Sequence, residues 1–304
     1  MSGGPRIVSL LPSATEIAVA LGLGENLVGR SHECDFPAWT TKLPVVTRTK
    51  LKKGLTSGEI DRRVQEIVSQ GLSVYEVDAA LLRELRPDII LTQTQCAVCA
   101  VTPGDLEETL NAWTGREPVL VSLAPDALGD VWGDLRRVGE AAGASAAAAS
   151  VVASLQARLE ALRRSAARAE APTVGAIEWI EPLMAAGNWV PELIEIAGGR
   201  ALFAKAGEHS PWLSWETLIE ADPDVIVAMP CGYRIAQTTA EWPTLTAHPA
   251  WRDLKAVRQG RVFVADGHHY FNRPGPRLLE SAEILAEILG HGTYGHENGG
   301  WIRV

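Results

Sequence analysis

Residues 145–169, SAAAASVVASLQARLEALRRSAARA, determine the architecture expected for this chain. These 25 residues contain no Pro and no Gly, and most are Ala, Leu, Arg, Glu or Gln, which favour helix intrinsically. Leu155, Leu159 and Leu162 recur every three or four residues, so the sequence predicts one helix with an apolar stripe. At 1.5 Å per residue it would be roughly 37 Å long. A long surface helix is one interpretation, and a strut that joins two lobes is the other.

Similar sequences flank this helix and favour the strut. Residues 81–93 (LLRELRPDIILTQ) and 215–230 (WETLIEADPDVIVAMP) each contain a helical pattern, then Pro-Asp, then a short apolar run. Proline ends a helix, and such a run is typical of a strand buried on both faces of a parallel sheet. One unit on each side predicts two Rossmann-like α/β lobes joined by a single long helix, with a ligand cleft between the lobes.

The length of 304 residues suits two domains of about 100–150 residues each. We expect an N-terminal α/β lobe at 1–125, linking helices at 126–172, a C-terminal α/β lobe at 173–290 and a loose tail at 291–304. Local patterns predict helices at 14–21, 57–69, 215–221 and 251–257, strands at 43–46 and 225–228, and a capping box of Ser13 with Glu16.

Composition excludes several classes of protein. The net charge of −9 argues against a nucleic-acid partner, and no apolar run approaches the roughly 18 residues that span a bilayer. The N-terminal segment MSGGPRIVSLLPSATE lacks the pattern of a signal peptide. The sequence as written therefore predicts a cytoplasmic protein, or a periplasmic or cell-surface one if a leader has been removed. We expect a monomer that does not insert into membranes.

Ligands of open α/β sheets bind at the carboxyl ends of the strands, so the loops that follow the expected strands are the candidate site. The candidates in the N-terminal lobe are Pro12, Ser13, His32, Glu33, Asp35, Phe36, Arg48, Gln93 and Gln95. The candidates in the C-terminal lobe are Trp179, Glu181, Trp189, Trp212, Tyr233, His268, His269 and Tyr270.

Three of these candidates, Trp179, Trp189 and Trp212, fall in expected loops. Indole rings there could form walls for a flat, partly apolar ligand. Ordinary packing in the core or between the lobes is the alternative.

The sequence predicts no metal site of the protein's own. Residues 32–35 (HECD) are consecutive and alternate in direction, so they cannot all bind one ion, and the same holds for His268 and His269. A His could still ligate a metal carried by the ligand, such as the cobalt of a corrin, with hydrogen bonding as the alternative. Cys96 and Cys99 form a lone CxxC, interpreted as two packed thiols, a local disulfide, a redox pair or half a metal site.

Signatures of catalysis are missing from the sequence. It contains no GxxxxGK[ST], GxGxxG or GxSxG pattern, and no spacing of Ser, His and Asp marks a triad. We therefore expect a binding protein without a catalytic cofactor.

Several motifs resemble the cobalamin and iron-siderophore class (class III) of substrate-binding proteins of ABC importers. They are residues 7–16 (IVSLLPSATE), 85–90 (LRPDII), 251–264 (WRDLKAVRQGRVFV) and 272–279 (NRPGPRLL). Residues 31–37 (SHECDFP) and 95–99 (QCAVC) resemble the branch that binds cobalamin.

The resemblance implies binding and delivery to a permease, with cobalamin as the ligand. It implies that Trp212 packs on the corrin and that Glu216 docks onto a permease arginine. The equivalent docking position in the first lobe is Ala80, with Asp78 as a nearby substitute. The missing export signal and this missing carboxylate keep open a cytoplasmic corrinoid carrier or sensor. A ferric-siderophore or haem-binding protein is the alternative, followed by a metal-dependent enzyme that uses His32, Cys34 and the His268–His269 pair.

Overall fold

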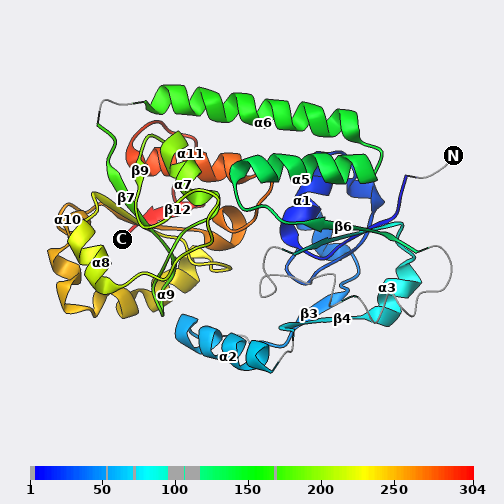
Figure 1. Ribbon diagram of the computed structural model, residues 1–304, viewed down its shortest axis with the longest axis horizontal. Helices are drawn as coiled ribbons and strands as arrows, with labels where there is room; N and C mark the ends of the chain where they lie inside the picture. The colour runs from blue at the N-terminus through cyan, green and yellow to red at the C-terminus, as the bar shows by residue number, and fades with distance from the viewer. Residues whose placement is uncertain (1–3, 53, 71–72, 95–105, 107–116, 168–169) are drawn as a thin grey trace. The chain divides into compact units, whose positions relative to one another are not determined.

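The computed structural model describes residues 4–52, 54–70, 73–94, 106, 117–167 and 170–304. Their contacts divide the chain into two compact units (Figure 1). The first unit takes in Met1–Leu55, Arg62–Pro125 and Gly129–Ser154, and the second takes in Thr56–Asp61, Asp126–Leu128 and Leu155–Val304. Both units are α/β, as the sequence predicted, and the predicted domain limits stay a prediction.

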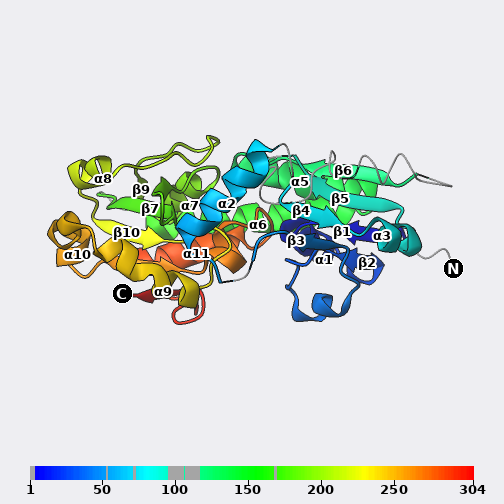
Figure 2. The ribbon, with the colours of Figure 1, turned by 90° about the horizontal axis from the view of Figure 1, so that it is seen from below.

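The first unit is built on a parallel four-stranded sheet. Its order is β2 (Leu27–Arg30), β1 (Ile7–Ser9), β5 (Ile89–Gln93) and β6 (Val119–Leu123), as Figure 2 shows. The helices are α1 (Pro12–Ala20), α2 (Ser57–Ser69, its first turn in the second unit), α3 (Ala79–Leu85), α5 (Leu128–Ala141) and the short η1 (Gly24–Asn26) and η2 (Ala38–Lys42). Strands β3 (Thr47–Thr49) and β4 (Tyr75–Val77) form a separate two-stranded antiparallel sheet.

The second unit contains a mixed sheet in the order β12 (Trp301–Arg303), β11 (Val262–Ala265), β10 (Val225–Ala228), β7 (Thr173–Trp179), β8 (Met184–Ala185). Strand β9 (Arg200–Ala201) also pairs with β7, and β7, β10 and β11 are parallel. The helices are α7 (Val190–Ile196), α8 (Trp215–Ala221), α9 (Ile235–Thr246), α10 (Lys255–Arg258), α11 (Leu278–Leu289), η3 (Pro249–Asp253) and the π-helical turn η4 (Gly267–Phe271). One core cluster joins the central strands to α8, α9 and η3 through Leu218, Leu245 and Trp251.

The long helix is α6 (Ser145–Ala166), which Figure 1 shows as one continuous element. It has 22 residues and ends three residues before the predicted limit. Its predicted apolar stripe is buried, and Arg158 bonds Glu283 of α11 at 3.0 Å. Because its residues 145–154 belong to the first unit and 155–166 to the second, α6 connects the two units along the chain.

The two Pro-Asp segments repeat each other in atomic detail. Helices α3 and α8 are capped at their N-termini by side chains, Asp78 and Ser214, each of which accepts a backbone N–H three residues later. Both helices end at a residue with left-handed backbone, Arg86 and Asp222, just before the proline.

The aspartate after each proline joins the beginning of a strand to the sheet. Asp88 accepts the backbone N–H of Arg6 at 2.8 Å, next to β1, and Asp224 accepts that of Thr173 in β7 at 2.8 Å. These equivalent bonds explain why the same dipeptide recurs in both units.

Asp224 makes two further contacts, because it also accepts the Thr173 hydroxyl and pairs with Lys255. The bond from Lys255, with those from Thr173, holds the pKa of Asp224 down to about 2. A lowered folded-state pKa contributes stability above pH ~4 that is lost as the pH falls towards 2.

We therefore expect Asp224→Asn to lower the free energy of unfolding by about 2 kcal/mol at pH 7, and by much less near pH 2. Asp88→Asn is the matched control, expected to cost about 1 kcal/mol. Urea unfolding across this pH range measures both. A loss for Asp224→Asn that does not change with pH would contradict the account.

Some local predictions are wrong. The predicted capping box does not form, because Leu11 is the N-cap of α1 and Ser13 lies inside the helix. The strand predicted at 43–46 lies at Thr47–Thr49, and the helix predicted at 251–257 is split into η3 and α10.

The tail is not loose, since it returns as β12 alongside β11. The Trp301 indole N–H donates to Glu287 at 2.7 Å, and this contact anchors the strand on α11.

Across the described ranges, no helix has both the length and the apolar character needed to cross a bilayer.

Candidate functional site

In the first unit, three predicted loops follow neighbouring parallel strands. Pro12 and Ser13 follow β1, residues 32–36 follow β2, and Gln93 is the last residue of β5. Because these strands are neighbours in one parallel sheet, the loops emerge at the same edge. Ser13 and Gln93 are buried, whereas Phe36 is exposed. Gln95, Cys96 and Cys99 lie outside the described residues.

The loop after β2 is anchored through its histidine. The backbone N–H of His32 and its ring Nδ1 both bond the Thr47 hydroxyl, at 3.1 and 2.8 Å, and its Nε2 lies 3.3 Å from Glu33. The ring also packs against Tyr75 of β4, with 5.6 Å between ring centroids. Cys34 points the other way, into the core, where the Thr15 hydroxyl donates to its sulfur. His32 and Cys34 thus lie in different surroundings, which is not the strict alternation expected for residues 32–35, because residues two apart would then share a side.

Arg48 was selected as a residue that follows a strand of the sheet, and this placement is wrong. It lies within β3, which pairs with β4 in a separate sheet, and its guanidinium bonds Glu76. This bond lowers the pKa of Glu76. The ligand-binding role of Arg48 stays a prediction.

In the second unit, the loops after β7, β10 and β11 contact one another. The ring of Trp179 meets that of Tyr233 edge-on, with 5.5 Å between centroids. The backbone N–H of His268 donates to the Tyr233 carbonyl at 2.9 Å, and the Asn272 amide donates to the Met229 carbonyl at 3.2 Å. The parallel strands and these bonds place the three predicted loops in one layer at the carboxyl edge of this sheet.

The Tyr233 hydroxyl bonds another side chain of the protein. It donates to Glu241 of α9 at 2.7 Å, and Glu241 also accepts the backbone N–H and the hydroxyl of Ser57. Burial, followed by the bond to Glu241, raises the pKa of Tyr233. Tyr233 is therefore a neutral phenol that offers a ring face rather than a charge.

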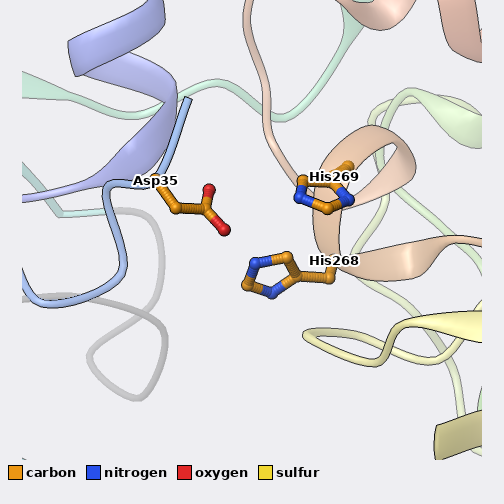
Figure 3. A group of neighbouring side chains, drawn as sticks. All are labelled: Asp35, His268 and His269. Carbon is orange, nitrogen blue, oxygen red and sulfur yellow. The ribbon is translucent and has the colours of Figure 1, made fainter. Parts of the chain in front are cut away.

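The turn η4 presents two histidines with different surroundings, His268 and His269 (Figure 3). Asp266 precedes the turn and accepts the backbone N–H of His269 at 2.7 Å and its Nδ1–H at 3.0 Å. Burial raises the pKa of Asp266, but the bonds from His269 outweigh burial and the pKa lies below its ordinary value. His268 instead approaches Arg273, with its Nε2 2.9 Å from the guanidinium.

The three loop tryptophans differ in exposure. Trp189 is only 6% exposed, and its indole N–H donates to the Phe271 carbonyl at 2.8 Å. Trp179 is half-buried beside Tyr233. Trp212 is 63% exposed although its backbone is held on both sides, by the bond from Ala185 to Pro211 and the bond from Leu213 to Leu183. Trp212 is thus a large aromatic ring on a fixed backbone.

Residues 203–211, just before Trp212, form a surface cavity of about 300 Å³ that the sequence did not indicate. It is lined by Phe203, Ala204, Lys205, Glu208, His209 and Pro211.

The remaining candidates lie at the surface. Glu181 follows β7 and is exposed, and Tyr270 is half-buried beneath the guanidinium of Arg277, 5.3 Å from its ring centroid. Glu216 is exposed in the first turn of α8. Bonds from its own backbone N–H and the Ser214 hydroxyl lower its pKa. Asp78 is exposed too, but its carboxylate caps α3.

Sequence reasoning missed four residues that hold these loops: Asp266, Asn272, Arg273 and Glu241. The Asp266-x-x-His269 spacing could have indicated the first, since an aspartate before a helical turn bonds the residue three later. The contacts of Glu241 depend on tertiary packing and leave no local signal.

The chain is similar to known proteins in both sequence and fold. The chain is 25% identical over 300 residues to the vitamin B12-binding protein of Vibrio cholerae serotype O1, covering 93% of this chain and 88% of that protein. Its fold matches the crystal structure of the periplasmic vitamin B12-binding protein BtuF of Vibrio cholerae, with a TM-score of 0.67, 21% identity and coverage of 94% and 97%. It also matches a periplasmic haem-binding protein from Pseudomonas aeruginosa, with a TM-score of 0.71, 22% identity and coverage of 94% and 93%.

The family match extends from the first strand of the first unit into the second unit. Residues 7–268 match the family described as periplasmic binding protein, which confirms the resemblance inferred from the sequence motifs. Binding proteins of this kind carry a ligand, as the B12-binding relatives do, rather than use a catalytic cofactor. The chain belongs to the periplasmic binding protein family.

Proposed function

We propose that this protein binds cobalamin or a related corrinoid as the substrate-binding component of an ABC importer, and that it works as a monomer without catalysing a reaction. The observation that carries the proposal is the similarity, along 93% of the chain, to proteins that are named for vitamin B12 binding. The proposed site uses the loops at the carboxyl ends of the strands in each unit, and corrin binding in a cleft between the units is part of the proposal.

The chemistry of the second-unit loops suits such a ligand. A corrin is flat and largely apolar on its faces, with amide side chains at its edge. Trp212 offers a broad exposed ring, and Trp179 with Tyr233 offers two more aromatic faces. Aromatic surfaces with a few placed polar groups are typical of sites for ligands of this shape.

The test is a tryptophan-fluorescence titration with cyanocobalamin, hydroxocobalamin and cobinamide, with ferric haem and a ferric hydroxamate as competing candidates. Saturable quenching by the corrinoids at micromolar concentration or below, and none by the iron chelates, is the expected result. Quenching by an iron chelate alone would replace the proposal with haem or siderophore binding. Stoichiometric zinc or iron in the purified protein, lost in His32→Ala, would favour the metal-dependent enzyme instead.

We further propose that Glu216 docks the protein onto a basic surface of a permease. Its carboxylate is exposed and ionised, although it accepts bonds from its own backbone N–H and the Ser214 hydroxyl, whereas the Asp78 carboxylate is the N-cap of α3 and is the weaker candidate. Delivery to an importer requires the protein to lie outside the cytoplasm, in contrast to the location predicted from the sequence as written, and cell fractionation tests this.

We expect Glu216→Arg to reduce ligand-stimulated ATPase activity of the reconstituted importer about tenfold while the corrinoid affinity stays unchanged, because opposite charges across an interface are replaced by like charges. Glu220→Arg, on the same helix and also exposed, is the matched control and should keep most of the activity. Equal losses in both variants would show that Glu216 has no specific docking role.

A further inference from the structure

The surface cavity next to Trp212 is held in shape by bonds between backbone segments of the second unit. The Asn188 N–H donates to the Glu208 carbonyl at 2.7 Å, and the Gly207 N–H donates to the Asn188 carbonyl at 3.0 Å. A Cβ at Gly187 would lie 2.7 Å from the Glu208 carbonyl oxygen, so this close approach of the two segments requires glycine. These contacts fix the backbone that lines the cavity before any ligand binds.

Phe203 lines the same cavity from a strained backbone position. Its φ is 74°, in the left-handed region that bulky residues seldom adopt. Its ring packs against the core cluster of the second unit, and a Cβ on Gly175 of β7 would lie 3.2 Å from that ring. Strained residues of this kind cluster at sites that hold ligands. Phe203 therefore supplies an apolar surface whose position is set by the core.

The charged side chains of the cavity are available to a ligand. The Lys205 ammonium lies 3.8 Å from the Glu208 carboxylate, and both side chains are largely exposed. His209 Nδ1 lies 3.0 Å from the Ser210 carbonyl, which can only accept, so in the neutral ring Nδ1 carries the hydrogen and Nε2 is an acceptor. With the described residues of the chain, the side chains of Lys205, Glu208 and His209 make no other hydrogen bond or ion pair.

The size and lining of the cavity indicate what it can hold. Its volume of about 300 Å³ lies at the lower end of the range for ligand pockets, so it suits one side arm of a macrocycle rather than the whole ring system. Phe203 and Pro211 suit a flat ring. Lys205 suits a phosphate, whereas Glu208 and His209 can accept hydrogen bonds from hydroxyl groups. A nucleotide combines a flat base, a phosphate and sugar hydroxyls.

We propose that this cavity binds the nucleotide arm of a complete corrinoid, and that the protein thereby prefers cobalamin to corrinoids without that arm. The inference rests on the proposed function and narrows it to ligands that carry a nucleotide. Pro211 lines the cavity and Trp212 follows it directly in the chain. An arm that leaves the edge of a corrin bound at Trp212 can therefore reach the cavity.

The experiment is a calorimetric titration with cyanocobalamin and with dicyanocobinamide, which lacks the nucleotide arm. We expect the wild type to bind cyanocobalamin about tenfold more tightly than dicyanocobinamide. Ala204→Leu fills part of the cavity and should remove this preference while the affinity for dicyanocobinamide stays unchanged. Ala206→Leu is the matched control, because Ala206 is exposed and does not line the cavity, and it should keep the preference.

A second variant tests the charge of the cavity without threatening the fold. The Lys205 side chain is 81% exposed, so Lys205→Ala should leave stability unchanged. It should lower the affinity for cyanocobalamin about two- to fivefold and leave that for dicyanocobinamide unchanged. An unchanged preference in Lys205→Ala would count against the phosphate contact and overturn the inference.

The other outcomes distinguish this inference from the proposed function. Equal affinity of the wild type for the two corrinoids would refute the nucleotide site and leave corrinoid binding in place. A preference that persists in Ala204→Leu, or one that is lost equally in Ala206→Leu, would also refute the site. Binding of neither corrinoid by the wild type would overturn the proposed function and this inference together.

Discussion

Gly267→Ala is expected to destabilise the protein by about 3 kcal/mol, a typical cost for inserting atoms into a tightly packed interior. The added Cβ would lie 2.1 Å from the Pro230 oxygen and 2.6 Å from the Met229 oxygen. Both are backbone atoms, so no side-chain rotation can relieve the clash. The loop after β10 and the turn η4 would have to separate, and corrinoid binding should weaken together with stability.

Urea unfolding and hydrogen exchange of residues 229–233 measure this change. Gly133→Ala is the control, because Gly133 lies within α5 and a Cβ there would meet nothing within 4 Å. That substitution should stabilise the protein by about 0.5–1 kcal/mol through helix propensity. A cost below about 1 kcal/mol for Gly267→Ala would mean that the close approach of the two loops is not required.

Trp212→Ala is expected to weaken cyanocobalamin binding by about tenfold to a hundredfold, roughly 1.4–2.7 kcal/mol. The ring is 63% exposed, so its removal costs little folding energy and the loss should appear in affinity. Fluorescence quenching by the corrinoid should also decrease, because Trp212 would be among the quenched residues.

Trp39→Ala is the matched control, since Trp39 is 41% exposed and is not a candidate ligand residue. Its affinity for cyanocobalamin should change less than about twofold. Calorimetric titration of both variants gives the comparison, and an unchanged affinity in Trp212→Ala would remove this ring from the site.

Elements with strong local patterns could be predicted from the sequence. Helix α2 at Ser57–Ser69, α8 at Trp215–Ala221 and β10 at Val225–Ala228 have the predicted limits. Ser214 caps the start of α8, and Pro223 lies between the end of α8 and the start of β10. Each signal lies within a few residues of the limit that it sets. Local start and stop signals of this kind set the limits of an element without contacts from the rest of the fold.

Elements that depend on distant partners could not be predicted. Strand β12 lies in a Gly-rich segment, and it forms because it pairs with β11 and because Glu287 binds the Trp301 indole. Helix α9 was missed, since Pro243 lies within it and interrupts the usual helical signal. The candidate site divides in the same way. The expected strands identified the loops of Trp179, Tyr233 and His268, because ligand sites lie at the carboxyl ends of such strands. The residues that orient these side chains could be identified only from the structure.

Calorimetric titration of the whole protein with cyanocobalamin shows whether the protein binds a corrinoid. Corrinoid binding predicts saturable, one-to-one heat with a dissociation constant in the micromolar range or tighter, about −8 kcal/mol or more favourable. No saturable binding up to about 100 μM, which corresponds to weaker than roughly −5.5 kcal/mol, would contradict it.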